Sequence, residues 1–178
     1  TDLARVFVAF GQTELNQYSS ISEAGTTHTL TIYGLKPNAE YQFQAIAFDS
    51  IGASESSLFD LTTGDLPNNI ITPTSVINNT NYNGYYMVNL ESANPRQTNI
   101  IDRDGNVVWY EQTDVPGAPC TGCFWTEKNT LLHLLEDCHT VRELSMAGTV
   151  LREVVLPDTF YVHHEFFLNN EDQLVAMV

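Results

Sequence analysis

An internal repeat of 43 residues is the feature that most restricts the fold of this chain. The matching segments are 104–108 with 147–151, 124–132 with 167–175 and, at a spacing of about 45, 85–90 with 130–135. A period in the low forties that contains only short apolar strands and glycine turns is typical of a four-stranded propeller blade. The sequence therefore predicts roughly two blades within residues 85–178.

A single blade cannot bury its own apolar face, so neighbouring blades must stack and the ring of blades must close. Residues 174–178 form an apolar strand without a polar exit. We therefore expect about four further blades after Val178, or another subunit that covers the open edge.

The first part of the chain predicts a different β-domain. Apolar and polar residues alternate, between Gly, Pro, Asn and Ser turns, in segments 4–10, 27–33, 41–48 and 58–62. The stretch LTIYGLKPNAEY, which ends at Tyr41, resembles the E to F corner of a fibronectin type III domain. In that fold the hydroxyl of the corresponding tyrosine hydrogen-bonds to backbone upstream. About two strands precede residue 27, so the first strand would lie upstream or come from another chain.

The expected fold class is all-β, and the chain divides into three parts. Residues 1–64 form a partial fibronectin-III-like β-sandwich, residues 65–84 a linker or incoming strand, and residues 85–178 the first blades of an incomplete β-propeller. No stretch combines a sustained 3.6-residue apolar period with helix caps, so little helix is expected.

The charge of the chain excludes two classes of partner. It has 7 Lys and Arg against 22 Asp and Glu, a formal net charge of −15. Such a chain repels phosphate backbones and anionic lipid, so we expect neither a nucleic-acid partner nor membrane insertion. The sequence starts at Thr1 and has no apolar run near 18 residues. It is expected to be a mature or cut chain of an exported protein, extracellular or periplasmic.

Three cysteines leave a disulfide, a metal site and buried thiols as alternatives. Cys120 and Cys123 form a C-x-x-C motif, and Cys138 follows. A hairpin that turns at residues 128–129 would place Cys120 almost opposite Cys138, which permits a disulfide and implies an oxidising compartment. A zinc site that adds His139 is disfavoured because neighbouring side chains on a strand point to opposite faces. No metal and no cofactor are expected.

The segment 102–106, DRDGN, has the composition of the start of a calcium loop. A calcium loop of 12 residues needs a bidentate Glu at its last position, and Thr113 occupies that position here. The segment therefore predicts a hairpin turn between strands at 98–101 and 107–110.

The sequence His163-His164-Glu165 is the strongest candidate for chemistry. The 43-residue register aligns the two histidines with Cys120 and Thr121, just before a strand of the inner type. Neighbouring side chains on an extended segment face opposite sides, so one imidazole can face the propeller channel while the other packs between blades. The remaining histidines, His28, His133 and His139, are expected to be structural.

The order of these motifs resembles the PAPS-independent aryl-sulfate sulfotransferases, which have an N-terminal β-sandwich-like domain followed by a six-bladed propeller. The resemblance rests on GLKP at 34–37 with Tyr41, TGDLP at 63–67, IDRDGNVVWY at 101–110, Glu143-Leu144 with Gly148, and the histidine pair.

The resemblance implies an enzyme that moves a sulfuryl group from a phenolic sulfate to a phenol through a sulfo-histidine. By position, His164, and after it His163, correspond to the first channel histidine of the family, an assisting or sulfate-binding residue. The nucleophilic His and helping Arg of the family match no position up to Val178, so the fragment alone is expected to be inactive. The alternative is a non-catalytic extracellular module that self-associates through the first domain or the open blade edge.

Overall fold

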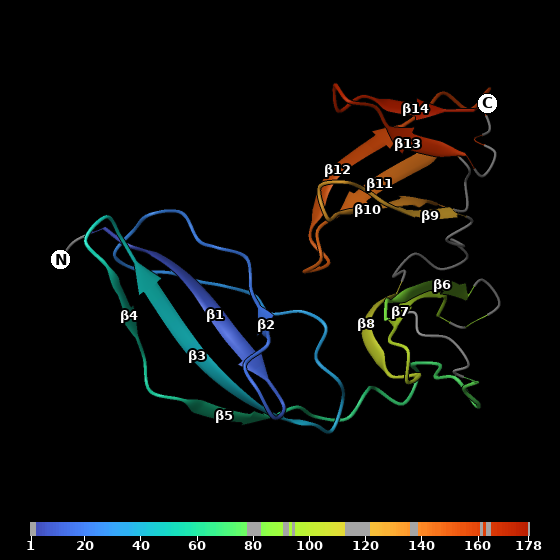
Figure 1. Cartoon of the computed structure of the whole chain (residues 1–178). Helices are drawn as coiled ribbons and strands as arrows, with labels where there is room; N and C mark the ends of the chain where they lie inside the picture. The colour runs from blue at the N-terminus through green and yellow to red at the C-terminus, as the bar shows by residue number, and fades with distance from the viewer. Residues whose placement is uncertain are drawn as a thin grey trace. The chain divides into compact units, whose positions relative to one another are not determined.

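A computed structural model describes residues 3–77, 83–90, 93, 95–112, 122–135, 139–160, 162 and 165–177. In this part of the chain there are fourteen β-strands and no helix, and all strand pairs are antiparallel. No helix of these residues could span a membrane. The chain divides into two compact units, Thr1–Leu66 and Pro67–Val178 (Figure 1). The all-β prediction is confirmed.

The first unit contains one five-stranded sheet in which β3 is central. Its strands are β1 (Arg5–Gly11), β2 (Gln17–Tyr18), β3 (Glu40–Phe48), β4 (Ala53–Glu55) and β5 (Phe59–Thr62). Strand β3 pairs with β1 along one edge and with β4 and β5 along the other. The strands predicted at 4–10, 41–48 and 58–62 are therefore confirmed to within one residue.

A tyrosine corner fixes the start of β3. The Tyr41 hydroxyl accepts a hydrogen bond of 2.9 Å from the Lys36 backbone N–H, and the ring is only 3% exposed. The ring packs with Phe10 and Ala39 in the core cluster of this unit. The Thr63 hydroxyl ties the same turn from the other side, because it donates to the Lys36 carbonyl at 2.6 Å. The corner predicted from the sequence is confirmed.

The prediction of a strand at residues 27–33 is wrong. The side chains of this segment alternate between half-buried and exposed, as the sequence pattern suggests. Its backbone groups, however, form no hydrogen bond to any described residue, so there is no ladder. The alternation comes from packing alone: Ile32 lies against the core of the sheet, while Thr31 faces outward. Side-chain pattern reports a buried face, but strand pairing also needs a neighbouring backbone.

The second unit begins with a segment that side chains hold against a sheet. Gln97 accepts a hydrogen bond from the Ile71 backbone N–H at 3.0 Å and donates to the Asn69 carbonyl. Asn99 donates to the Ile71 carbonyl at 2.9 Å. Both amides are at most 1% exposed. Side-chain amides thus replace a strand ladder, and no strand is present in the described residues between β5 and β6.

Three antiparallel sheets follow. Their strands are β6 (Tyr86–Leu90), β7 (Gln97–Ile101), β8 (Val107–Gln112), β9 (Gly122–Trp125), β10 (Leu131–Leu134), β11 (Thr140–Leu144), β12 (Val150–Val155), β13 (Phe166–Leu168) and β14 (Leu174–Ala176). They form the sheets β6-β7-β8, β9-β10-β11-β12 and β13-β14, each in sequence order. The first and last residues of β11 and β12 lie 43 residues after those of β7 and β8, so the sequence repeat is also a repeat of strands. The described strands do not close into a ring or a barrel.

Four hairpin turns of this unit have one hydrogen-bond pattern. In each five-residue turn, a side-chain oxygen at the first position accepts the backbone N–H groups of the third and fifth positions, at 2.9–3.2 Å. The fourth residue has a positive φ. The turns are 102–106, 126–130, 145–149 and 169–173, with Gly105, Asn129, Gly148 and Asp172 at the fourth position. Glycine and, less often, Asn or Asp tolerate this conformation. The hairpins predicted at 102–106 and around 128–129 are confirmed.

The two inner strands of the middle sheet β9-β10-β11-β12, which are β10 and β11, are buried on both faces. Leu132, Leu134 and Val141 form a core with Phe166 of β13. On the other face, Leu131 and Leu144 pack with Trp109 and Met87 of the first sheet. All four residues of β10 are buried. The Trp109 indole N–H also donates to the Met146 carbonyl at 2.8 Å. This bond connects the sheet β6-β7-β8 to the turn between β11 and β12 of the middle sheet.

We expect Tyr41→Phe to lower the free energy of unfolding by about 1–3 kcal/mol, because it removes the hydroxyl that accepts the hydrogen bond of the partly buried Lys36 N–H. Chemical denaturation followed by near-ultraviolet circular dichroism measures the change. Tyr33→Phe is the matched control, since Tyr33 is 40% exposed, and it should be neutral. Equal stability of Tyr41→Phe and wild type would contradict a stabilising corner.

Candidate functional site

The predicted histidine pair, His163 and His164, lies outside the described residues, as do Cys120, Cys138 and the triplet Asn78-Asn79-Thr80, which has the sequence of an N-glycosylation site. The structure does describe the residues on either side of the pair. Val162 is 3% exposed and Phe166 is 1% exposed. Both side chains belong to one core cluster with Leu132, Leu134 and Val141. The chain is therefore anchored in the core immediately before the pair and two residues after it.

Glu165, the third residue of the motif, is held by the last strand. Its carbonyl accepts a hydrogen bond of 3.0 Å from the Met177 backbone N–H, which continues the pairing of β13 with β14. The Glu165 side chain is exposed. The motif thus leads directly into a paired strand, as the repeat predicted.

A glycine permits close packing beneath this strand. A Cβ atom at Gly122, the first residue of β9, would lie 2.9 Å from a ring carbon of Phe166. Such a distance is shorter than real Cβ contacts. The Phe124 ring meets the Phe166 ring edge to face, with 4.7 Å between centroids. The 43-residue repeat aligns Gly122 with Glu165. The residue that follows the histidine pair is therefore charged, whereas the residue at the same position of the preceding repeat is a glycine.

His139 holds the segment that leads to the histidine pair. Its Nδ1 atom lies 2.6 Å from the Phe160 carbonyl oxygen, and its own carbonyl accepts the Leu156 N–H at 2.8 Å. A hydrogen bond to a carbonyl requires the proton on Nδ1. These contacts give His139 the structural role expected of it.

The other two predicted structural histidines differ in their surroundings. In the first unit, the His28 ring lies 2.9 Å from the Ser22 hydroxyl and 3.1 Å from the Gly25 carbonyl. His133, on β10, is 2% exposed, and its Nε2 atom has no hydrogen-bond partner in the described part of the chain. Cys123 is a buried thiol whose sulfur lies 3.9 Å from that of Met87. The described residues contain no cluster of His, Cys, Asp and Glu that could hold a metal.

Charged side chains connect the middle sheet to the third sheet. Glu143 is 7% exposed, accepts the Thr130 hydroxyl at 2.6 Å and pairs with Arg152 at 2.8 Å. Arg152 also donates to the Asp172 carbonyl at 2.8 Å. Lys128 pairs with the Asp172 carboxylate at 2.8 Å. The hydrogen bond from Lys128 is the main cause of an Asp172 pKa below its ordinary value.

The sequence analysis missed this network, although a signal was present. The dipeptide Arg-Glu occurs on both strands of one hairpin, at 142–143 and 152–153. Antiparallel pairing then places each arginine opposite a glutamate, which is the register observed. Opposite charges across strands stabilise a sheet pair.

A hollow of about 210 Å³ lies beside this network. Its walls include Phe124, Trp125 and Phe167, which are 37–55% exposed, and the Lys128–Asp172 ion pair. It lies at the turn end of β9 and β13, whereas the histidine pair precedes the other end of β13 in the sequence. The hollow therefore lies at the opposite end of β13 from Glu165, the residue that follows the histidine pair in the sequence.

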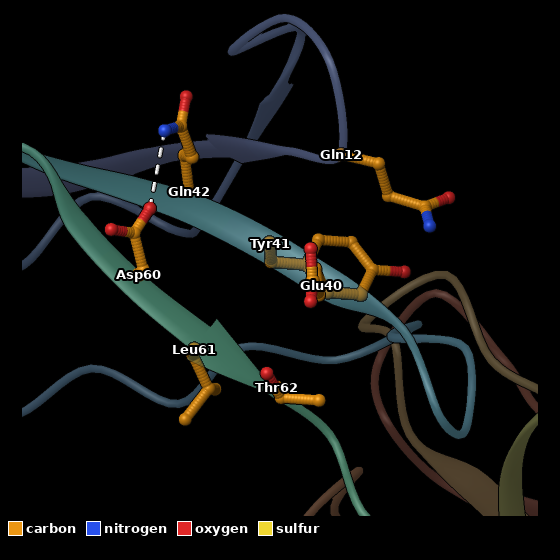
Figure 2. A pocket seen from close by; sticks show the side chains of 7 residues that line it. All are labelled: Gln12, Glu40, Tyr41, Gln42, Asp60, Leu61 and Thr62. Carbon is orange, nitrogen blue, oxygen red and sulfur yellow. Dashed lines mark hydrogen bonds between the residues drawn. The ribbon is translucent and has the colours of Figure 1, made fainter.

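The first unit has a polar hollow of about 560 Å³ along β3 and β5 (Figure 2). Glu40 and Asp60 line it, and the Gln42 amide donates to the Asp60 carboxylate at 3.1 Å. Tyr41 also lines it, but its hydroxyl already accepts a hydrogen bond from the Lys36 backbone N–H. The lining contains no histidine, cysteine, lysine or arginine. This hollow offers no activated nucleophile, so it is a weaker candidate for catalysis than the histidine pair.

These features define an all-β protein built from a repeated antiparallel sheet, with one histidine pair that precedes β13 in the sequence. The family model Arylsulfotransferase (ASST) matches residues 71–178. The chain belongs to this arylsulfotransferase family. The resemblance inferred from the sequence is confirmed for those residues, which include the histidine pair, while the motifs of the first unit lie outside the match.

One solved structure is similar to the chain, a protein of unknown function from Bacteroides caccae. The two share 14% sequence identity with a TM-score of 0.41, and the similarity covers 98% of this chain. This chain spans 65% of that chain. No curated protein matches the sequence.

We expect Gly122→Ala to lower the free energy of unfolding by about 1–3 kcal/mol, because the new methyl group overlaps the Phe166 ring. Thermal unfolding measures the loss, and the double variant Gly122→Ala/Phe166→Leu should recover part of it. Gly52→Ala is the control, since nothing lies within 4 Å of a Cβ there. A double variant that loses the sum of both single effects would contradict the contact.

Lys128→Met should raise the pKa of Asp172 toward its ordinary value, because it removes the main hydrogen-bond donor to the carboxylate. The pKa of Asp172 is lower in the folded state than in the unfolded state, so its carboxylate stabilises the fold at pH values above the unfolded-state pKa. This stabilisation is lost as the pH falls through the folded-state pKa. An NMR titration that follows the Asp172 carboxyl carbon measures this pKa in the wild type and in Lys128→Met. Lys36→Met is the control, and an unchanged Asp172 titration in Lys128→Met would refute the assignment.

Proposed function

We propose that this chain is the N-terminal part of an exported arylsulfotransferase, which transfers a sulfuryl group from a phenolic sulfate to a phenol. The observation that carries the proposal is the family match over residues 71–178, which includes His163 and His164. The residues on either side of the pair in the sequence also support the proposal, because the side chains of Val162 and Phe166 are both buried in one core. Buried neighbours are the kind of support that a catalytic group needs.

The architecture we propose is that of the family. The sheet β9-β10-β11-β12 is one propeller blade, the sheets before and after it belong to the neighbouring blades, and the complete ring has six. Support comes from the 43-residue spacing of β7 and β8 from β11 and β12, and from the two-sided burial of the middle sheet. The first unit is a partial fibronectin-III-like sandwich, supported by the tyrosine corner.

The proposed reaction has two transfers. In the first, a neutral imidazole nitrogen attacks the sulfur, the bond from sulfur to the phenolic oxygen breaks, and the phenolate leaves and takes up a proton. In the second, the oxygen of an acceptor phenol attacks the same sulfur, the nitrogen–sulfur bond breaks, and the acceptor loses its proton. Sulfur keeps its three other oxygens and its oxidation state throughout, so no redox cofactor is required.

In this scheme, His164 assists and does not attack. Its imidazole binds the equatorial oxygens of the sulfuryl group and stabilises the charge that develops on them, and His163 is the second choice for this role. The nucleophilic histidine and the helping arginine of the family have no counterpart among the residues of this chain. The fragment by itself is therefore inactive.

The partners in this proposal are a phenolic sulfate and a phenol, with no nucleic acid and no membrane insertion. The net charge of −15 supports the two exclusions, because it disfavours polyanions. The place of action is extracellular or periplasmic.

The test is a sulfuryl-transfer assay of the full-length protein with a phenyl sulfate donor and a phenol acceptor. We expect His164→Ala to lower kcat/KM by about 100-fold or more, which is the effect of removing one charge-stabilising donor. His28→Asn is the control, because His28 lies in the first unit, and it should keep wild-type activity after its fold is checked.

Each outcome has one interpretation. Full transfer by His164→Ala removes this residue from the mechanism, and the same assay on His163→Ala then tests the second choice. Absence of transfer by the wild type under a range of donors would favour a non-catalytic extracellular module.

A further inference from the structure

Three side chains with metal-binding atoms meet between the first sheet and the middle sheet. The Cys123 thiol on β9 lies against the Met87 thioether on β6, with 3.9 Å between the two sulfurs. His133 on β10 is the direct cross-strand neighbour of Cys123. Opposite residues of an antiparallel pair share one face of the sheet. Leu131, two residues before His133, packs with Cys123 in one cluster, which agrees with a shared face.

The surroundings of these donors are apolar and leave the imidazole unsatisfied. Cys123 is 6% exposed and His133 is 2% exposed. The cluster around the thiol consists of Leu131, Leu144 and Trp109. The Nε2 atom of His133 has no hydrogen-bond partner in the part of the chain that the structure describes. A buried polar atom without a partner costs about 1–3 kcal/mol, and a bound cation would remove this cost.

The next interface between sheets shows that stacking does not need these donors. Each of the three residues has an apolar counterpart one repeat later, in the pairs Met87 and Leu132, Cys123 and Phe166, and His133 and Ala176. The last two apolar residues are cross-strand neighbours, as the corresponding donors are. All three apolar residues pack together in the core between the middle and third sheets. Sulfur and nitrogen atoms at the same three places of the preceding interface therefore indicate a purpose other than packing.

The geometry and the charges fit a soft monovalent cation. Two sulfur ligands that each lie about 2.3 Å from one ion are about 4.0 Å apart when their bonds form an angle of about 120°. The observed separation is 3.9 Å. Thiolate and thioether sulfur select Cu(I). A thiolate cancels its single positive charge, which an apolar interior requires. The nearest cross-strand cation, Arg142, is already paired with Glu153 at 2.8 Å.

We propose that Cys123, Met87 and His133 form a Cu(I) site that links the first sheet to the middle sheet. On binding, the Cys123 thiol gives its proton to solvent, and the two sulfurs and the His133 Nε2 atom coordinate the ion. One Cu⁺ enters and one proton leaves, so charge balances and no oxidation state changes. Copper here stabilises the stacked sheets, and the proposal does not depend on the sulfuryl-transfer function.

The test is an anaerobic titration of the full-length protein with Cu(I) in competition with the chelator bicinchoninate. It uses the background Cys120→Ser/Cys138→Ser, which removes the other two thiols of residues 1–178. We expect one Cu(I) whose affinity falls about 100-fold or more in Cys123→Ser, and about tenfold or more in Met87→Leu or His133→Leu. The same three substitutions in the wild-type cysteine background keep the comparison valid if the serine variant does not fold.

Matched controls separate this site from surface binding. Met177→Leu removes a thioether that is 57% exposed, and His28→Asn removes an imidazole of the first unit. Both should bind Cu(I) as the background does. An affinity that Cys123→Ser leaves unchanged, or that the controls lower as much as Met87→Leu and His133→Leu do, would overturn the proposal.

Two further measurements report the ligands and the link between sheets. X-ray absorption at one equivalent of Cu(I) should show two sulfurs at about 2.3 Å and one nitrogen, and one sulfur fewer in Met87→Leu. Cu(I) should raise the Tm of the background but not that of Cys123→Ser. Without metal, His133→Leu should be at least as stable as the background, because it removes an unpartnered buried nitrogen. A spectrum with no sulfur pair, or an equal rise in Tm in Cys123→Ser, would contradict the site.

Discussion

The burial of the inner strands of the middle sheet, β10 and β11, on both faces is the constraint on which the second unit depends. Every residue of β10 is buried, with Leu132 and Leu134 packed toward the third sheet and Leu131 toward the first. A strand of this kind is stable only if sheets cover both of its sides. The stacking is therefore a condition for folding the repeat, and it also fixes Val162 and Phe166 around the histidine pair.

Local patterns in the sequence predicted those parts of the fold that local chemistry determines. Segments 102–106 and 128–129 predicted hairpins, and Tyr41 after Leu-Lys-Pro predicted a corner, because in each case nearby residues supply the hydrogen bonds. Residues 27–33 misled the prediction because pairing depends on a distant backbone, which alternation does not report. The amides of Gln97 and Asn99 were equally invisible, since buried amides are rare and their partners lie 26–28 residues away.

At the candidate site, too, the sequence predicted the local features and missed those that depend on distant residues. The repeat placed the histidine pair at the start of a strand, and the described flanks agree, because Glu165 leads into β13. The sequence did not reveal the link from Glu143 through Arg152 to Asp172, which joins two sheets near the far end of that strand. Its members are 9 and 20 residues apart, so their meeting depends on strand register and sheet stacking together.

The four hairpin turns show how little information this geometry needs. Asp102, Thr126, Ser145 and Asn169 all provide the accepting oxygen, and either glycine or a residue with a short polar side chain follows at the fourth position. Only the first and fourth of the five positions are restricted in residue type, and the other three can vary. Ancestral duplicates can therefore diverge until their alignment is barely detectable, while the hydrogen-bond skeleton at each bend stays the same.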